Sequence, residues 1–146
     1  MELQIPQIID LASAFYGSSV LFSALDLDLF TAIKECEHPT AETLAERCHC
    51  SLRGITLLLD AAVSIGLLTK TDGCYALTQA TALTLVKHAP HDLTRAIAYN
   101  RDVYQAWGKL TQFVQAGKPV EKPEIHLGED AERTRRFALS MYGWIK

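Results

Sequence analysis

The sequence predicts a mainly α-helical fold, a winged helix-turn-helix with a small β-hairpin and additional helices on its N- and C-terminal sides. Between Thr40 and Thr78, two helical stretches precede two short β-prone runs that flank Asp72-Gly73, and Asp-Gly between such runs is a strong hairpin signal. Apolar residues recur at three- and four-residue spacing in the segments before and after. With 49% apolar residues in 146, the chain can fill the core of one domain, residues 1–146.

The first expected helix covers Ile5–Phe22, and its apolar stripe fills nearly half of the helical circumference. The stripe consists of Ile5, Ile8, Ile9, Ala12, Phe15, Tyr16 and Val20. One neighbour cannot cover so wide a stripe in a monomer of this size, so we expect a C2 homodimer. A second helix is expected over Leu25–Glu35, and His38-Pro39 ends it.

The winged-helix core is expected at about residues 40–78. Thr40 is a natural N-cap for a helix over Ala41–Cys48, and Ser51 caps a second one that runs to about Ile65. Gly66 then provides a left-handed C-cap. The strands of the wing are expected at Leu67–Thr71 and Cys74–Leu77.

Helices are also expected after the wing. A short one covers Gln79–Val86 and a long one runs from about Asp92 to Val114. Residues 116–128 hold two Gly and two Pro and form a loop. A last amphipathic helix covers Glu129–Lys146, with an apolar face made of Thr134, Phe137, Ala138, Met141, Tyr142, Trp144 and Ile145.

Charge argues against nucleic-acid binding by the winged helix. Residues 40–78 hold three basic residues against four acidic ones, whereas phosphate contacts supply most nonspecific affinity for DNA. The candidate recognition helix offers Arg53 and Asp60 among residues that are apolar on almost every side, which is typical of a core helix. We therefore expect the winged helix to serve as a packing unit.

The four cysteines are Cys36, Cys48, Cys50 and Cys74. Cys48-His49-Cys50 lacks the two-residue gap of common zinc sites, so we expect packing side chains and no metal. The start of the chain shows no export signal, and no apolar run approaches the roughly 18 residues of a membrane helix. A cytoplasmic chain with free thiols and no membrane contact is expected.

In its order of motifs the chain resembles the N-terminal dimerisation domain of S-adenosylmethionine-dependent small-molecule O-methyltransferases. The motifs are "IIDLASAFYGSSVLFSALDLDLFTAI", "TAETLAERCHC", "RGITLLLDAAVSIGLLTKTDGCYALT", "WGKLTQFVQAGKP" and "RRFALSMYGW". The resemblance covers essentially the whole chain. It implies a homodimer in which the first helix reaches the partner subunit, and a complete enzyme that methylates a hydroxyl of an aromatic or polyketide-like small molecule.

In that family a Rossmann-like catalytic domain follows and binds S-adenosylmethionine. That domain is not expected within this chain, because its eight glycines are scattered and no G-x-G occurs. We therefore expect no catalytic residue and no cofactor bound by this chain, while S-adenosylmethionine is implied for the complete enzyme. The chain alone is therefore not expected to be an enzyme, whereas the resemblance implies that the parent protein is an S-adenosylmethionine-dependent O-methyltransferase.

Six residues are candidates for binding the acceptor substrate. Phe137 and Met141 match family positions that line the acceptor cleft, and both also fit a helix core. Asn100 lies mid-stripe on the long helix, where a buried amide needs a partner, either a structural one or a substrate. The aromatic candidates are Phe15, Tyr16 and Trp107, for which plain core packing is the alternative. Two other functions stay open, a winged-helix DNA-binding regulator and a stand-alone dimeric interaction module.

Overall fold

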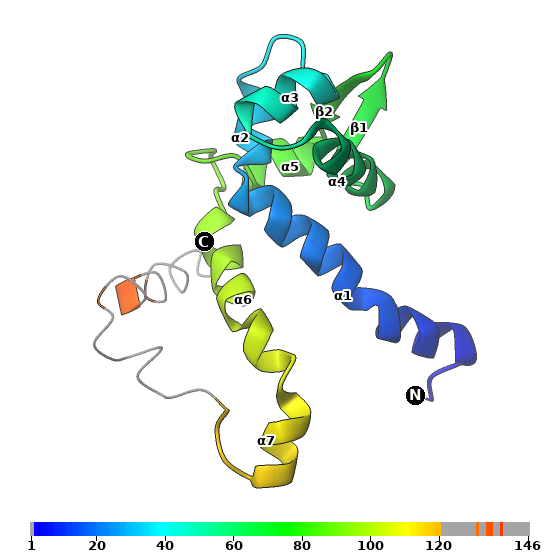
Figure 1. Cartoon of the computed structure of the whole chain (residues 1–146), viewed down its shortest axis with the longest axis vertical. Helices are drawn as coiled ribbons and strands as arrows, with labels where there is room; N and C mark the ends of the chain where they lie inside the picture. Colours follow the sequence, from blue (N-terminus) through cyan, green and yellow to red (C-terminus); the bar gives the residue numbers. More distant parts are fainter. Residues whose placement is uncertain (1, 121–130, 132–133, 136–137, 139–146) are drawn as a thin grey trace. The chain divides into compact units, whose positions relative to one another are not determined.

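The computed structural model describes residues 2–120, 131, 134, 135 and 138. It consists of two compact units, residues 1–90 and 91–146, and each is described by itself (Figure 1). The first unit contains α1 (Ile5–Asp26), α2 (Leu29–Lys34), α3 (Ala41–Arg47), α4 (Leu52–Ser64), β1 (Leu68–Thr71), β2 (Cys74–Leu77) and α5 (Gln79–Thr84). The second contains α6 (Thr94–Trp107) and α7 (Leu110–Ala116). The mainly helical winged-helix fold expected from the sequence is confirmed.

Short polar side chains start the winged-helix elements. Thr40 Oγ1 accepts a hydrogen bond from the Thr43 backbone N at 3.3 Å, and Thr43 Oγ1 accepts one from the Thr40 backbone N at 3.0 Å. This reciprocal pair is a capping box with threonine in the place of the usual Glu or Gln. Ser51 Oγ accepts from the Gly54 backbone N at 3.1 Å. A Cβ at position 54 would lie 2.9 Å from that oxygen, so glycine lets the cap close tightly.

The wing is a two-stranded antiparallel hairpin in which Leu68 pairs with Leu77 and Thr71 with Cys74. Asp72 and Gly73 both have positive φ, 48° and 80°, as a type I′ turn requires. Gly66, at φ 79°, ends the preceding helix in the left-handed region, as expected. The Tyr75 backbone N also donates to the Pro39 carbonyl at 2.9 Å, which holds the hairpin against the α2–α3 connection.

The core of the first unit lies between α2, α3, α4 and the inner face of the hairpin. Its largest side chains are exposed by less than 2% and are Tyr75, Phe30, Leu29, Leu44, Ile55, Leu59 and Leu68. The buried residues of α4 are Ile55, Leu59 and Ala62, which follow the three- and four-residue spacing of one helix face.

Two helix boundaries differ from those expected. Residues 25 and 26 belong to α1, because the chain turns at Leu27-Asp28 and α2 begins only at Leu29. Asp28 has φ 52°, a left-handed conformation that Asp tolerates better than most residues. The long helix expected up to Val114 is interrupted between Trp107 and Leu110, at Gly108, where glycine lowers helix stability. Of the helix expected over Glu129–Lys146, positions 131, 134, 135 and 138 are helical, and the rest lies outside the described residues.

Candidate dimer interface

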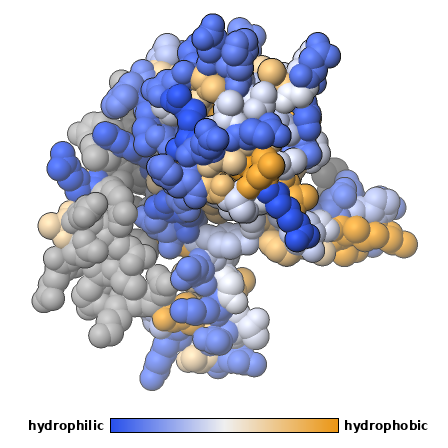
Figure 2. All heavy atoms as spheres, turned by 45° about the horizontal axis from the view of Figure 1, so that its top comes forward, coloured by the Kyte–Doolittle hydropathy of each residue, from blue (hydrophilic) through white to orange (hydrophobic). Residues whose placement is uncertain are grey.

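The most exposed apolar surface of the first unit lies along the first part of α1. Residues 3–16, called the α1 arm below, hold Leu3, Ile5, Ile8, Ile9, Leu11, Phe15 and Tyr16, each exposed by 48–75%. Figure 1 shows α1 extending away from the winged-helix body, and Figure 2 shows its free end as hydrophobic surface at the right of the view. Within α1, only Ala24 is buried. The arm therefore presents apolar side chains that the first unit itself does not cover.

The six of these side chains that belong to α1, all but that of Leu3, share one side of the helix. At about 100° per residue, the arc from Leu11 through Ile8 to Ile9 spans roughly 160°. The opposite side carries small or polar residues, among them Asp10 and Ala14. The ring centroids of Phe15 and Tyr16 lie 4.2 Å apart and are as exposed as the rest of the arm. The alternative that these two aromatic side chains are core of the first unit is therefore wrong.

The arm and the residue just before it carry acidic side chains and no basic one. Lys34 is the first Lys or Arg of the sequence, whereas Glu2 and Asp10 lie in the first 16 residues. Because the exposed side chains of the arm are apolar, a surface that covers them should be apolar too. A basic margin on that surface would match the acidic residues.

By length and composition, α1 is a candidate membrane span. The expectation that no apolar run approaches that length was wrong, since the 22-residue helix holds only two charged residues, Asp10 and Asp26. The criterion is weak evidence for one helix near the N-terminus, because core helices and signal sequences meet it too. A helix that packs on a partner protein has the same composition.

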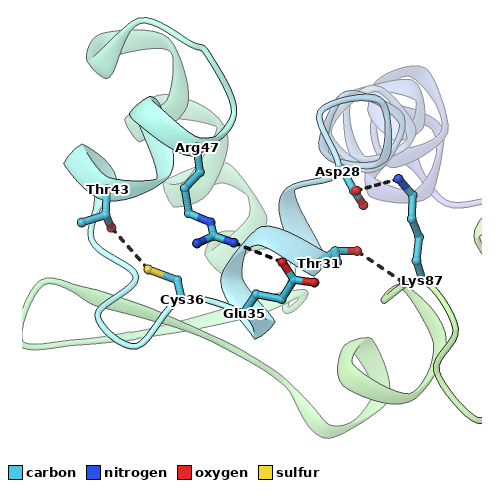
Figure 3. A network of polar contacts seen from close by, with 7 residues as sticks. All are labelled: Asp28, Thr31, Glu35, Cys36, Thr43, Arg47 and Lys87. Carbon is cyan, nitrogen blue, oxygen red and sulfur yellow. Dashed lines mark hydrogen bonds and ion pairs between the residues drawn. The ribbon is translucent and has the colours of Figure 1, made fainter.

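The root of α1 is held at the turn that follows it (Figure 3). Lys87 Nζ donates to Asp28 Oδ2 at 2.6 Å, and the Lys87 backbone N donates to Thr31 Oγ1 at 3.4 Å. The two residues of the ion pair are about half-exposed, so the pair contributes about 0–1 kcal/mol. It joins positions 59 residues apart, which no local sequence pattern could have indicated.

A second pair of contacts joins α2 to α3. Arg47 donates to Glu35 Oε2 at 3.1 Å, and Cys36 Sγ lies 3.8 Å from Thr43 Oγ1 (Figure 3). The ion pair lies at the surface, whereas the contact of Cys36 with Thr43 is partly buried, and both join the two ends of the short α2–α3 connection. Together with the Lys87 contacts, they hold α2 and the turn at Asp28 that follows α1.

On the wing side, α4 is tied to the hairpin by one carboxylate. Lys70 Nζ and the Tyr75 hydroxyl both donate to Asp60 Oδ1, each at 2.8 Å. These two bonds hold the pKa of Asp60 below its usual value, and the bond from Lys70 has the larger effect. The bond to Asp60 raises the pKa of Lys70, and burial raises the pKa of Tyr75.

The outer side of α4 is partly open, whereas the sequence suggested a helix enclosed on almost every side. Leu57 is 63% exposed, and Arg53, Asp60 and Ser64 lie exposed beside it. The only lysine of the wing, Lys70, is paired with Asp60. This surface is therefore a poor match for a phosphate backbone.

The four cysteines are free thiols and partly buried. Cys50 Sγ donates to the Cys48 carbonyl at 3.2 Å. Burial, and then the neighbouring Cys50 thiol, raise the pKa of Cys48, which lowers its nucleophilicity at neutral pH. Within the described residues, no three His, Cys, Asp or Glu side chains lie together as a metal site.

The candidate substrate residues are distributed over the two units. Phe15 and Tyr16 lie on α1. Asn100 and Trp107 lie on α6, and both are exposed, Trp107 by 68%. The expectation of a buried amide at Asn100 was therefore wrong. Phe137 and Met141 lie outside the described residues, and substrate binding by all six residues stays a prediction.

A family model described as the O-methyltransferase dimerisation domain matches residues 9–87. The chain is 34% identical over 139 residues to a tetracenomycin polyketide synthesis 8-O-methyl transferase of Streptomyces glaucescens, covering 92% of this chain and 41% of that protein. It is 31% identical over 124 residues to acetylserotonin O-methyltransferase of Gallus gallus, covering 80% of this chain and 36% of that protein. The chain therefore spans about two fifths of these relatives.

Solved structures show the same fold. Human N-acetylserotonin methyltransferase, solved in complex with SAM, matches with a TM-score of 0.80 and 25% identity over 97% of this chain and 47% of that one. An O-methyltransferase family protein from Burkholderia thailandensis matches with a TM-score of 0.85 and 18% identity, covering 99% of this chain and 43% of that one. Together with the family match over residues 9–87, these findings show that the chain belongs to the O-methyltransferase dimerisation domain family.

Proposed function

We propose that this chain is the dimerisation and substrate-recognition part of an S-adenosylmethionine-dependent O-methyltransferase that acts on an aromatic or polyketide-like small molecule. The family match supports the dimerisation role. Relatives named for methylation of a polyketide and of 3-hydroxy-5-methyl-1-naphthoate support the substrate class. The observation that carries the proposal is the exposed α1 arm.

The area of the arm fits a homodimer. At roughly 200 Å² for a fully exposed large side chain, the seven apolar residues of the arm expose on the order of 800 Å² per copy, about what one partner contributes to a standard stable interface. A C2 dimer covers this surface on both copies, because the two-fold axis repeats each contact. Covering it with protein releases apolar surface from water, at about 25 cal/mol per Å² before the costs of association.

Light scattering on the chain at micromolar concentration tests the homodimer. We expect a dimer for the unmodified chain and a monomer for Ile8→Asp, because the new carboxylate would be buried in the apolar contact. Ala14→Asp is the matched control on the opposite side of α1 and should remain dimeric. A folded monomer for the unmodified chain would contradict the proposal.

For substrate recognition, the proposal assigns the acceptor contacts to Phe137, Met141, Asn100, Phe15, Tyr16 and Trp107. Aromatic and thioether side chains supply area to a flat apolar acceptor and adapt to its shape. The exposure of Phe15, Tyr16 and Trp107 supports this role, because none of the three is occupied by core packing.

Met141→Ala in the full-length protein tests the substrate role. A pocket residue would raise KM or change acceptor preference with little change in Tm. A core residue would instead cost about 2–5 kcal/mol of stability. Normal kinetics together with a large loss of stability would show that Met141 does not bind the acceptor.

For the cofactor, the proposal assigns S-adenosylmethionine to a part of the protein other than this chain. The described glycines lie on separate helices and turns, for example Gly17 in α1, Gly66 after α4 and Gly73 in the wing. They do not form the clustered loop that lets a backbone approach a nucleoside. Calorimetry on the chain alone should detect no binding of S-adenosylmethionine, and micromolar affinity would contradict this assignment.

The DNA-binding alternative is tested by a mobility shift at low salt. We expect no shift, because Lys70 is paired and Arg53 stands beside Leu57 and Asp60. A cytoplasmic location fits the four free cysteines and stays a prediction.

A further inference from the structure

We propose that Cys48 and Cys50 form a reversible disulfide within the chain when oxidised glutathione, a low-molecular-weight disulfide, accumulates around the protein. The two cysteines flank His49 in the turn that joins α3 to α4. The site uses no residue of the α1 arm and none of the six residues assigned to the acceptor. It therefore goes beyond the proposed function and does not depend on it.

The backbone of this turn brings the two cysteines to bridging distance. Cys48 is the C-cap of α3, and the His49 backbone N donates to the Glu46 carbonyl at 3.2 Å. The Cys50 backbone N donates to the Ala45 carbonyl at 2.9 Å. With His49 at φ 53°, these two bonds make a Schellman motif. Helical backbone of either hand places residues i and i+2 about 5.4 Å apart between their Cα atoms, and a disulfide needs roughly 4.4–6.8 Å.

The Cys50 side chain is turned back toward Cys48. Cys50 Sγ donates to the Cys48 carbonyl at 3.2 Å, so this side chain folds over the turn. Burial is the largest cause that raises the pKa of Cys48, and the nearby Cys50 thiol is the next. Both thiols are only partly buried, which leaves them within reach of a small solute.

The other two cysteines lie on different elements. Cys36 follows α2, and its thiol contacts Thr43 Oγ1 at 3.8 Å, whereas Cys74 is the first residue of β2. Neither belongs to the turn between α3 and α4. Among the four cysteines, all of which are described, Cys48 and Cys50 are thus the pair that one short turn holds together.

The bridge forms by two exchange steps. The Cys50 thiolate attacks one sulfur of oxidised glutathione, the S–S bond of glutathione breaks, and one glutathione leaves as a thiolate that takes up a proton. Cys48 then loses its proton to water and attacks the Cys50 sulfur of the mixed disulfide, which releases the second glutathione. The two thiols lose two electrons and two protons, and one oxidised glutathione becomes two reduced ones. Cys50 attacks first, because the raised pKa of Cys48 leaves less of it as thiolate at neutral pH.

The bond is reversible because it closes a very short loop. A short loop removes little entropy from the unfolded chain, and strained or exposed disulfides are reduced more easily than structural ones. In a reducing glutathione pool both residues are therefore thiols, and the bridge forms when oxidised glutathione predominates. Ser51, the N-cap of α4, follows Cys50 directly, so the bridge would close the turn of the winged-helix core covalently.

Peptide mapping of the full chain tests the bridge. Trypsin cuts after Arg47 and Arg53, so the peptide 48–53 contains both cysteines of the turn and neither of the other two. The folded chain is equilibrated with oxidised glutathione in excess over reduced glutathione, its free thiols are blocked with N-ethylmaleimide, and it is digested. We expect this peptide to be lighter than the dithiol by two hydrogen atoms, to carry no N-ethylmaleimide, and to return to the dithiol with dithiothreitol.

Cysteine variants supply the matched controls. The double variant Cys36→Ser, Cys74→Ser should give the same bridged peptide. Cys48→Ser should stop at a glutathione adduct on Cys50, and Cys50→Ser should form its adduct on Cys48 more slowly. A faster reaction at Cys48 would overturn the assigned order of attack. N-ethylmaleimide on both cysteines of the unmodified peptide, glutathione retained on either one, or a bridge from either one to Cys36 or Cys74 would overturn the inference.

The same equilibrium in concentrated urea separates the effect of the folded turn from mere closeness in sequence. We expect the ratio of bridge to dithiol to be about tenfold higher in the folded chain, because the turn already holds the two cysteines at bridging distance and so raises their effective concentration. Circular dichroism confirms which samples are folded. An equal or lower ratio in the folded chain would show that the fold does not favour the bridge, and the inference would be wrong.

Discussion

The Tyr75 hydroxyl on β2 donates a hydrogen bond to Asp60 Oδ1 on α4 at 2.8 Å. The Tyr75 ring is 1% exposed, and Lys70 Nζ lies 4.7 Å from its centroid. One side chain therefore joins the core, the wing and α4. The polar groups of Lys70, Tyr75 and Asp60 are thus engaged with one another.

Tyr75→Phe should reduce the free energy of unfolding by about 1 kcal/mol, because it removes one hydrogen bond and leaves the ring packing in place. Asp60 keeps its bond to Lys70 and its access to water, so the loss stays at the low end for a charged acceptor. Urea unfolding monitored by circular dichroism measures it. An unchanged midpoint would show that the hydroxyl does not stabilise the wing.

Stability should depend on pH through Asp60. Its pKa is lowered in the folded chain, so its contribution is complete above its unfolded pKa of about 4 and disappears as the pH falls through the lower folded value. Asp60→Asn should therefore be less stable than the unmodified chain near pH 6, and this difference should shrink as the pH falls toward 2. Thermal unfolding of both chains over that range is the measurement. A difference that stays constant with pH would contradict the role of the ionised carboxylate.

The contribution of Lys70 should disappear at the other end of the pH range. Its pKa is raised by the bond to Asp60, so the contribution is complete below its unfolded pKa of about 10.4 and is lost as the pH rises through the higher folded value. Lys70→Met should thus destabilise the chain at pH 8, in the same direction as Asp60→Asn at pH 6. In 1 M salt the effect should be smaller, because both partners are partly exposed. A salt-independent effect would point to lost packing of the lysine stem.

Truncation of two leucines on α4 should change the stability by very different amounts. Leu59 is 0% exposed and Leu57 is 63% exposed. Leu59→Ala should cost about 2–5 kcal/mol through lost burial and a cavity, whereas Leu57→Ala should stay within about 0.5 kcal/mol. Chemical unfolding at one protein concentration compares them. A large loss for Leu57→Ala would show that this side chain is covered in solution.

Two glycines should also differ. Gly66 has φ 79° and Gly17 lies inside α1, and an added Cβ would meet no atom within 4 Å at either position. Gly66→Ala should cost about 1–2 kcal/mol from backbone strain alone. Gly17→Ala should stabilise the helix by up to about 1 kcal/mol. If Gly17→Ala instead weakens the dimer, a partner approaches the backbone closely there.

Local sequence determined much of this fold because its signals act over a few residues. Thr40 and Ser51 start their helices, Gly66 ends one, and Asp72-Gly73 turns the hairpin, each through hydrogen bonds or φ values within four residues. The apolar spacing of α1 likewise indicated a surface that needs a partner. The same spacing could not show which apolar positions are covered, so Leu57 and Asn100 were placed inside whereas the structure exposes them.

Only the tertiary structure decided the contacts between distant residues. The Lys87–Asp28 pair, the Tyr75–Asp60 bond and the turn at Asp28 depend on segments brought together by the collapse of the core, and no periodicity encodes them. The exposure of Phe15, Tyr16 and Trp107 was decided in the same way, since an aromatic residue on an apolar stripe fits a core and an interface equally well. The sequence by itself thus determined where helices and turns form, because those energies are local. Burial depends on which surfaces meet, so only the folded chain showed which apolar side chains of α1 its own core leaves uncovered.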